Sequence, residues 1–138
     1  MRKVRADLHL HTCLSPCADN QMQATAIVEQ AGKMGLDMIA ICDHNSAENV
    51  AAVVKAGERE DLAVLGGMEV TSSEEVHILG LFDTREALMR MQDKVYENLP
   101  GENSEDAFGP QLVIDEWNNV LAKNNRLLIG ATGLTVEQ

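Results

Sequence analysis

The sequence predicts an α/β fold, because stretches typical of strands alternate with stretches typical of helices along the chain. Residues 4–10 alternate polar and apolar side chains, as a half-buried strand does. Residues 37–42 form a short continuous apolar run, which is typical of a parallel strand buried on both faces. The chain has 138 residues, of which 45% are hydrophobic, so we expect one domain that spans residues 1–138.

Hydrophobic periodicity and turn residues place the remaining elements. Helices are expected at 24–34, ending at Gly35, from 45 or 46 to about 56, at 84–98 and at 111–123, and further strands at 62–70 and 76–82. Only a few residues separate those two strands. Because a parallel crossover needs about a dozen or more residues, the pair is expected to form an antiparallel β-hairpin at about 62–82.

The composition excludes several classes of protein. The formal net charge is −11 and no cluster of Lys or Arg is evident, so nucleic acid is not expected as a partner. No apolar run reaches the roughly 18 residues of a membrane span, and the first residues do not form a signal peptide. Three cysteines give no disulfide framework. These features predict a cytoplasmic protein.

The first residues that point to chemistry are His9 and His11. Side chains two apart on a strand share a face, so the two imidazoles and Asp7 should line one surface at the end of the first strand. Neutral imidazole nitrogens are good ligands for divalent transition metals. Two ordinary surface or core histidines that happen to alternate are about as frequent, so this pair alone does not decide the matter.

A second pair, Asp43 and His44, directly follows the apolar run at 37–42. In parallel α/β folds this is the carboxyl end of a strand, where active sites gather. Ionisable groups next to a buried strand need a partner or a metal. The competing interpretation is a solvated turn in which Asp43 caps the following helix.

The predicted hairpin brings a third pair together. Glu69 lies late in one strand and His77 early in the next, so the turn should place them at the same edge of the sheet. Singly, each could be an ordinary strand residue. Together, however, the four histidines with Asp43 and Glu69 all fall at strand ends on one predicted face. A carboxylate among imidazoles can bridge two metal ions, an arrangement suited to hydrolysis at phosphorus, and Asp43 and Glu69 are the predicted catalytic carboxylates.

Four motifs in order resemble the polymerase-and-histidinol-phosphatase (PHP) superfamily. They are Asp7–Thr12 (DLHLHT), Ile41–Asn45 (ICDHN), Gly67–Val70 (GMEV) and Val76–Leu81 (VHILGL). The resemblance implies part of a distorted (β/α)7 barrel and a centre of two or three zinc, manganese or iron ions. It further implies cleavage of a phosphoester by a metal-activated water. Carried over by motif, the metal ligands would be His9, His11, His44, Glu69 and His77.

The chain departs from the family pattern in two places. Where many members have a ligand Asp in Ser-Asp-Gly, the sequence offers Asp19, which we predict as a metal ligand, with Cys17 as a soft-ligand rival that would favour zinc or iron. The alternative is a solvated loop. In addition, no histidine follows His77, and Thr135 to Gln138 look like the start of a helix. We therefore expect the N-terminal portion of a longer barrel, whose exposed edges a missing C-terminal segment or an oligomer would cover.

The leading hypothesis is thus a metal-dependent phosphoesterase that acts on a small phosphorylated substrate. Two alternatives stay open. One is a non-catalytic PHP-like module with a binding or regulatory role, because the later ligands are missing. The other is an amidohydrolase-type enzyme, because His-x-His on a first barrel strand suits amide chemistry too. No substrate-binding residue can be assigned from the sequence.

Overall fold

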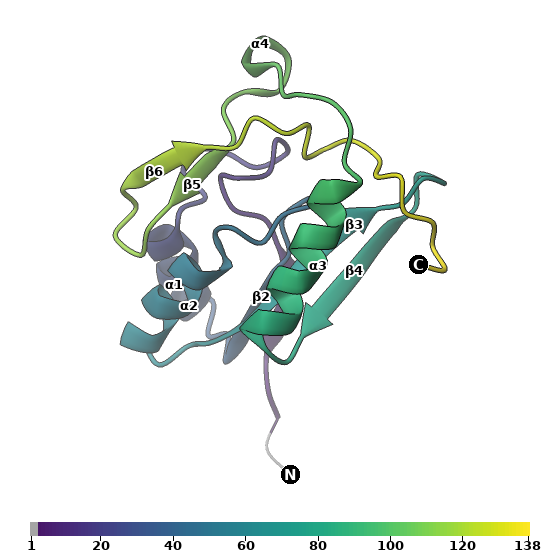
Figure 1. Ribbon diagram of the computed structural model, residues 1–138. Coiled ribbons are helices and arrows are strands. Elements are labelled where there is room, and N and C mark those ends of the chain that lie inside the picture. Colours follow the sequence, from purple (N-terminus) through teal and green to yellow (C-terminus); the bar gives the residue numbers. More distant parts are fainter. Residues whose placement is uncertain (1–2) are drawn as a thin grey trace.

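The computed structural model describes residues 3–138 as a curled sheet with helices on one face and a small second sheet beside it (Figure 1). The elements in chain order are β1 (Ala6–Leu10), α1 (Ala24–Lys33), β2 (Met38–Ile41), α2 (Val50–Arg59), β3 (Ala63–Thr71), β4 (His77–Phe82), α3 (Arg85–Glu97), α4 (Glu105–Phe108), β5 (Leu112–Ile114) and β6 (Val120–Lys123). This confirms the predicted α/β class. None of the helices in residues 3–138 has the length and apolar character that crossing a membrane requires.

The main sheet has the strand order β1-β2-β3-β4. The first three strands are parallel, with Ile39 of β2 opposite Asp7 of β1 and Val64 of β3. β4 runs antiparallel to β3, with Glu69 opposite Leu79, so the predicted hairpin is confirmed. The carboxyl ends of the three parallel strands and the amino end of β4 therefore meet at one edge of the sheet.

The end of α1 shows how local sequence sets an element boundary. Gly35 follows the helix with φ +65°, a left-handed conformation that glycine adopts without a steric penalty. The N–H of Gly35 donates to the carbonyl of Gly32, and the N–H of Leu36 donates to the carbonyl of Ala31. This pair of bonds is a Schellman motif, and it confirms Gly35 as the predicted stop.

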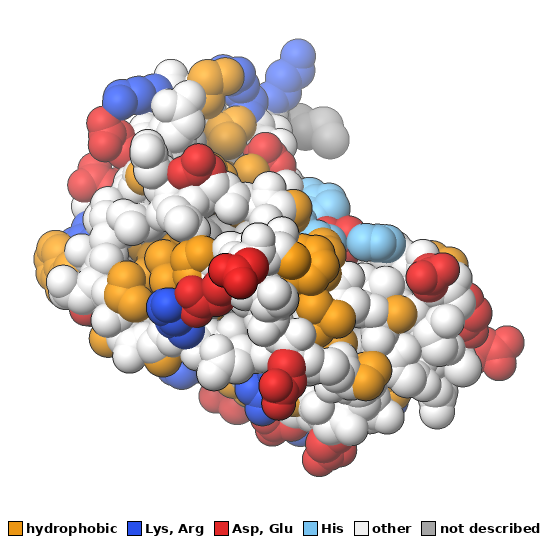
Figure 2. Space-filling view, turned by 90° about the horizontal axis from the view of Figure 1, so that it is seen from above, with side chains coloured by type: hydrophobic (Ala, Val, Ile, Leu, Met, Phe, Trp, Pro, Cys, Tyr) orange, Lys and Arg blue, Asp and Glu red, His pale blue; other side chains and the backbone are white. Residues whose placement is uncertain are grey.

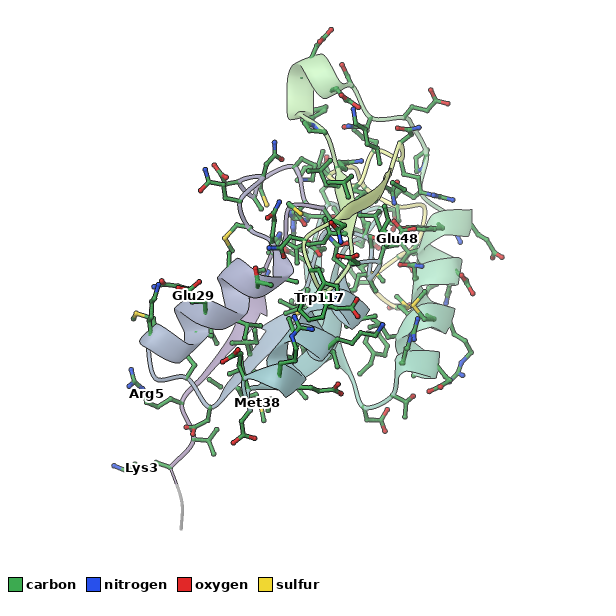
Figure 3. The ribbon with its side chains drawn as sticks, turned by 90° about the vertical axis from the view of Figure 1, so that its left-hand side faces the viewer. Lys3, Arg5, Glu29, Met38, Glu48 and Trp117 are labelled. Carbon is green, nitrogen blue, oxygen red and sulfur yellow. The ribbon has the colours of Figure 1, made fainter. Side chains whose placement is uncertain are left out.

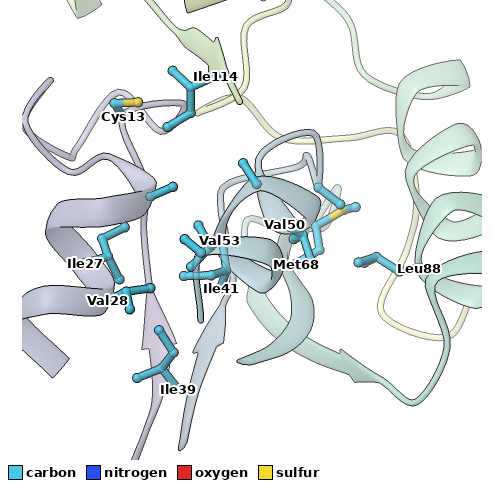
Figure 4. Packing of buried hydrophobic residues seen from close by; sticks show 14 of the residues in the cluster. Cys13, Ile27, Val28, Ile39, Ile41, Val50, Val53, Met68, Leu88 and Ile114 are labelled. Atoms are coloured by element: carbon cyan, nitrogen blue, oxygen red, sulfur yellow. The ribbon is translucent and has the colours of Figure 1, made fainter. Parts of the chain in front are cut away.

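The core lies between the helices and one face of the sheet. Ile39 and Ile41 of β2, Val53 of α2, Met68 of β3 and Leu88 of α3 are all at most 2% exposed (Figure 4). On the opposite face, Leu79 and Leu81 of β4 stay 40% and 42% exposed. The sheet is therefore fully packed on the helical side alone.

The predicted helix at 111–123 is wrong, because the segment forms the antiparallel pair β5 and β6. The turn between them contains Asp115, whose Oδ1 accepts hydrogen bonds from the N–H groups of Trp117 and Asn119. Asn118 in this turn has φ +67°, which a helix cannot contain. The tip of the hairpin lies beside α2, where the Arg59 guanidinium stacks 3.9 Å from the ring centroid of Trp117, labelled in Figure 3.

The start of α2 differs from the prediction, and the last four residues make the contact expected at a helix start within a turn. α2 begins at Val50 rather than at 45 or 46, because Asn45 has φ +50° and the N–H of Ala47 is bound to Oε1 of Gln92 on α3. Thr135 to Gln138 form a turn, in which the N–H of Thr135 donates to Oε1 of Gln138 at 2.9 Å.

Candidate metal centre

All four histidines lie around one carboxylate at the edge where the strand ends meet. Figure 2 shows the histidine side chains gathered at one place on the surface with a carboxylate between them. Neighbouring imidazole centroids are 5.0 Å apart for His9 and His11, 4.6 Å for His11 and His44, and 5.6 Å for His44 and His77. The geometric prediction that these strand ends converge is confirmed.

Glu69 is the centre of this cluster. Its Oε2 lies 2.8 Å from Nε2 of His9 and 2.9 Å from Nε2 of His11. Its Oε1 lies 2.7 Å from Nδ1 of His77, the contact that the β3–β4 hairpin was predicted to make. Nδ1 of His44 is 3.9 Å from Oε2. One carboxylate thus presents each of its two oxygens to imidazole nitrogens.

Three of these atoms touch one another. Nε2 of His9 is 3.0 Å from Nε2 of His11, and both contact Oε2 of Glu69. An imidazole nitrogen has either a proton or a lone pair. With Glu69 ionised, two protonated nitrogens repel each other, whereas an unprotonated nitrogen turns its lone pair toward the carboxylate. No placement of protons makes all three contacts favourable.

A cation between the three atoms would satisfy all of them. Two ligands that subtend 90° at a cation, each about 2.1 Å away, lie about 3 Å apart. The three observed separations are 2.8, 2.9 and 3.0 Å, which matches one face of an octahedron. Two histidines and one carboxylate on such a face are a common ligand set for ferrous iron, and the same donors also bind zinc and manganese. The donor set fits a divalent metal.

His44 adds a second sign of a missing partner. It is 5% exposed, and its Nδ1 has no hydrogen-bond partner among residues 3–138. The backbone around it is fixed, because the N–H of Glu69 donates to the carbonyl of Asp43 and the N–H of Asn45 donates to the carbonyl of Glu69. Burial lowers the pKa of His44 to about 4, and the neighbouring histidines lower it further against the opposing effect of Glu69. The ring is therefore neutral at pH 7, the state in which imidazole binds metals.

Two effects act in opposite directions on Glu69. Burial alone would raise its pKa, but hydrogen bonds from His9 and His77 and the charges of His44 and His11 outweigh burial, so the pKa is lowered. The carboxylate is thus ionised near neutral pH. It is the acceptor and the negative charge that a site for cations needs.

Asp43 lies behind the cluster and is completely buried. Its carboxylate accepts three hydrogen bonds of 2.7 Å, from the N–H and the hydroxyl of Thr12 and from the hydroxyl of Ser15. Ser15 Oγ also accepts from the N–H of His44 at 3.0 Å. Burial raises the pKa of Asp43, against the opposing effect of these donors. Asp43 and Ser15 therefore tie the loop after β1 to the backbone of His44.

Comparison with known proteins identifies the family. A family model described as PHP domain matches residues 7–133. The chain belongs to the PHP domain family. The match extends to residues 83–133, which the sequence motifs alone did not connect to the family.

Curated relatives are similar in sequence to about half of this PHP domain. A phosphoribosyl 1,2-cyclic phosphate 1,2-diphosphodiesterase from Eggerthella lenta is 35% identical over 80 residues, which are 54% of this chain and 29% of that protein. A DNA polymerase III of PolC type from Oceanobacillus iheyensis is 39% identical over 67 residues, 49% of this chain and 5% of that protein. A 5'-3' exoribonuclease from Haemophilus influenzae is 28% identical over 78 residues, 54% of this chain and 27% of that protein.

Two solved structures resemble the PHP domain in fold. A protein assigned as a metal-dependent phosphoesterase, from Bifidobacterium adolescentis, superposes with a TM-score of 0.56 at 28% identity, covering 70% of this chain and 34% of that one. An amidohydrolase from Chromobacterium violaceum, with bound sulfate, gives a TM-score of 0.55 at 28% identity, covering 67% and 34%. The chain spans about a third of these structures and less than a third of the curated relatives.

The loop after β1 holds the two candidates for the residue that departs from the PHP pattern. Asp19 is exposed and outside the groups of converging ligand atoms, and its Oδ1 accepts the N–H of Gln21 at 2.7 Å. Cys17 instead lies with Sγ 3.3 Å from Nδ1 of His11 and groups with His11 and His44. Burial and the charges of Asp43 and Glu69 raise the pKa of Cys17, against a backbone hydrogen bond, so the thiolate form needs a cation beside it.

The buried polar residues that fix the backbone next to the cluster were not identified from the sequence. Thr12 and Ser15 are buried and bind Asp43. Asn45 fixes the segment after β6, because its Nδ2 donates to the carbonyls of Leu128 and Gly130, each at 2.8 Å. Small polar residues next to predicted ligands were a usable signal, but their partners lie up to 85 residues away.

Proposed function

We propose that this PHP domain supplies the ligands of a two- or three-metal centre in an enzyme that hydrolyses phosphoesters. The ligands are His9, His11, His44, Glu69 and His77. The observation that carries the proposal is the mutual contact of His9, His11 and Glu69, which protons cannot satisfy and a cation can. Three overlapping groups of donor atoms, each within 4.8 Å, support more than one ion position.

The chemistry follows from the donor set. A divalent cation in such a site lowers the pKa of a coordinated water toward about 7 and stabilises negative charge on a phosphoryl group. Glu69 holds the negative charge of the site and joins the group around His9 to the group around His77. Glu69 is thus a catalytic carboxylate that acts within the centre. Asp43, the other predicted catalytic carboxylate, acts through His44 and the loop at Ser15, because all three of its hydrogen bonds go to that loop.

Phosphoester hydrolysis is supported by the relatives. Two of them have names of phosphodiester-cleaving or RNA-cleaving enzymes, and one structural neighbour is assigned as a metal-dependent phosphoesterase. A small phosphorylated substrate fits the net charge of −11 better than a nucleic acid does, because a strongly negative surface repels long polyanions. Zinc, manganese and iron all suit the imidazole and carboxylate donors.

Amide hydrolysis is a second candidate. The structural neighbour from Chromobacterium violaceum is an amidohydrolase, and its fold agrees as well as that of the phosphoesterase. The same metal-bound donors can activate water for either reaction. The two candidates therefore differ in substrate rather than in the centre.

The test compares Glu69→Gln with the unchanged chain. Both proteins are stripped with a chelator and reloaded with zinc or manganese, and bound metal is counted. We expect two or more ions in the unchanged chain and loss of at least one in Glu69→Gln, because an amide cannot supply the bridging charge. Hydrolysis is followed with p-nitrophenyl phosphate, bis(p-nitrophenyl) phosphate and a cyclic amide. Metal-dependent phosphoester cleavage should fall by at least about 100-fold in the variant.

Glu29→Gln is the matched control, because Glu29 lies on the surface of α1 and not in the histidine cluster. Its Oε1 forms an ion pair with Nζ of Lys33 at 2.6 Å. It should keep the metal and the activity. Cleavage of the amide alone would support the second candidate. Stoichiometric metal without any turnover would support a non-catalytic module, and equal metal binding by Glu69→Gln would refute the centre.

A further inference from the structure

Cys17 and His44 stand out because neither is explained by the group around His9. Sγ of Cys17 lies 3.3 Å from Nδ1 of His11, on the opposite side of that ring from Nε2, which contacts Glu69. The thiol, an imidazole nitrogen of His11 and one of His44 all lie within 4.8 Å of one another. Independently, Nδ1 of His44 is buried and has no hydrogen-bond partner among the described residues.

Cys17 lies in a loop whose preceding residues are fixed by burial and hydrogen bonds. Leu14 is fully buried, and Ser15 is bound to the carboxylate of Asp43. Successive turns follow, in which the N–H of Ser15 donates to the carbonyl of Thr12 and the N–H of Ala18 donates to the carbonyl of Ser15. Pro16 restricts the backbone between them. Because the residues before Cys17 are anchored in the core, the position of the thiol is set in advance.

The distances agree with a shared cation. A thiolate sulfur about 2.3 Å and an imidazole nitrogen about 2.1 Å from a tetrahedral ion lie about 3.6 Å apart. The observed separation of 3.3 Å between Cys17 and His11 is close to this value. Asp19, in contrast, has its Oδ1 engaged by the N–H of Gln21 and lies outside the three donor groups.

We propose that Cys17 is a thiolate ligand of one metal ion of the centre, together with His11 and His44. Nδ1 of His11 faces this ion, while its Nε2 faces the ion of the His9 group, so the ring would bridge the two ions as an imidazolate. The protons of the thiol and of the imidazole would be released to solvent when the ions bind. This inference rests on the proposed metal centre. A thiolate is a soft donor, so it biases this position toward zinc or ferrous iron and against manganese and magnesium, which prefer oxygen ligands. The position of Cys17 thereby determines which metal the protein selects, at a place where a carboxylate would select a harder ion.

Cobalt(II) provides a direct test, because a thiolate bound to cobalt gives a charge-transfer absorption in the near ultraviolet that nitrogen and oxygen ligands do not give. The full 138-residue chain is stripped of metal and titrated with cobalt. We expect the charge-transfer band together with the visible bands of bound cobalt. Cys17→Ser should abolish the charge-transfer band while cobalt at the remaining positions keeps its visible bands.

Cys13→Ser is the matched control, because Cys13 is buried and its Sγ faces the carbonyl of Leu112 at 3.8 Å. It should keep the band. In a separate competition, Cys17→Asp should change the ratio of zinc to manganese affinity by more than about tenfold in favour of manganese, since replacing a direct ligand should exceed the effect of an outer partner.

The outcomes separate the two proposals. Cobalt bound with no charge-transfer band in the unchanged chain overturns the role of Cys17 and leaves the metal centre standing. A band that persists in Cys17→Ser also overturns it. No bound cobalt in any protein overturns both.

Discussion

At the scale of the residue, the site contains ionisable side chains whose mutual contacts cannot all be favourable hydrogen bonds. Glu69 contacts three histidine nitrogens at 2.7 to 2.9 Å, and the buried His44 keeps Nδ1 without a hydrogen bond in the described chain. A buried polar atom without a partner costs roughly 1–3 kcal/mol. The protein retains this cost next to a carboxylate, which is the arrangement that binding a cation would relieve.

His44 makes the metal-free protein sensitive to acid. Its pKa is about 4 in the folded chain and near the ordinary value of 6.5 in the unfolded chain. Below pH 6.5 the unfolded state therefore takes up a proton that the folded state does not, and the stability falls as the pH drops from 6.5 toward 4. In chelator, we expect the free energy of unfolding by urea to fall by about 2 kcal/mol between about pH 7.5 and about pH 5.

His44→Gln should flatten this profile, whereas His77→Gln should keep it, because the side chain of His77 is 50% exposed. A stability that rises on acidification over this range, or the same slope in His44→Gln, would contradict the assignment. Glu69, whose pKa is lowered, adds a loss of stability only at lower pH, as the pH falls from 4.5 through its folded pKa.

At the scale of the element, a segment far along the chain supplies the hydrogen bond that caps the first turn of α1. α1 begins after Gln23, which gives no side-chain cap. Instead, Oδ1 of Asn118 in the turn between β5 and β6 accepts the N–H of Thr25 in the first helical turn, at 3.1 Å. A helix cap usually comes from the residue just before the helix. Here it comes from 93 residues further along the chain, so no local pattern could predict it.

Asn118 gives the prediction at this scale. Asn118→Gly keeps the left-handed conformation but removes the cap, so it should cost about 1 kcal/mol of unfolding free energy. Asn118→Ala adds the strain of φ +67° and should cost about 2 kcal/mol. Urea unfolding of the two variants measures the difference. Equal stability of the alanine variant and the unchanged chain would show that neither the cap nor the conformation matters.

Strands and helices up to Glu97 could be predicted because their signals are local. Examples are the apolar run of β2 and Gly35 after α1. The β5–β6 hairpin could not be predicted, because Leu112 to Ile114 pair with residues across a turn. The hydrogen bonds that Asp115 accepts in that turn leave no hydrophobic pattern in the sequence. The convergence of the four histidines followed from strand order. The placement of Cys17 rather than Asp19 near His11 required the buried contacts of Thr12 and Ser15, which the sequence does not show.

At the scale of the whole molecule, the fold gathers polar groups at one edge of a sheet that is packed on one face. α1, α2 and α3 cover that face (Figure 1). Leu79 and Leu81 remain partly exposed on the other face. The proposed metal ligands lie within or shortly after the strands β1 to β4, and no histidine follows His77 in the sequence. All five proposed metal ligands therefore lie within residues 9–77.

The most direct measurement is anomalous scattering from crystals of the chain equilibrated with zinc, recorded at the zinc absorption edge. We expect a peak about 2.1 Å from Nε2 of His9, Nε2 of His11 and Oε2 of Glu69, and a second peak next to His44. If zinc were absent from the cluster and the three atoms kept their mutual contacts of 2.8 to 3.0 Å, the central claim would be contradicted.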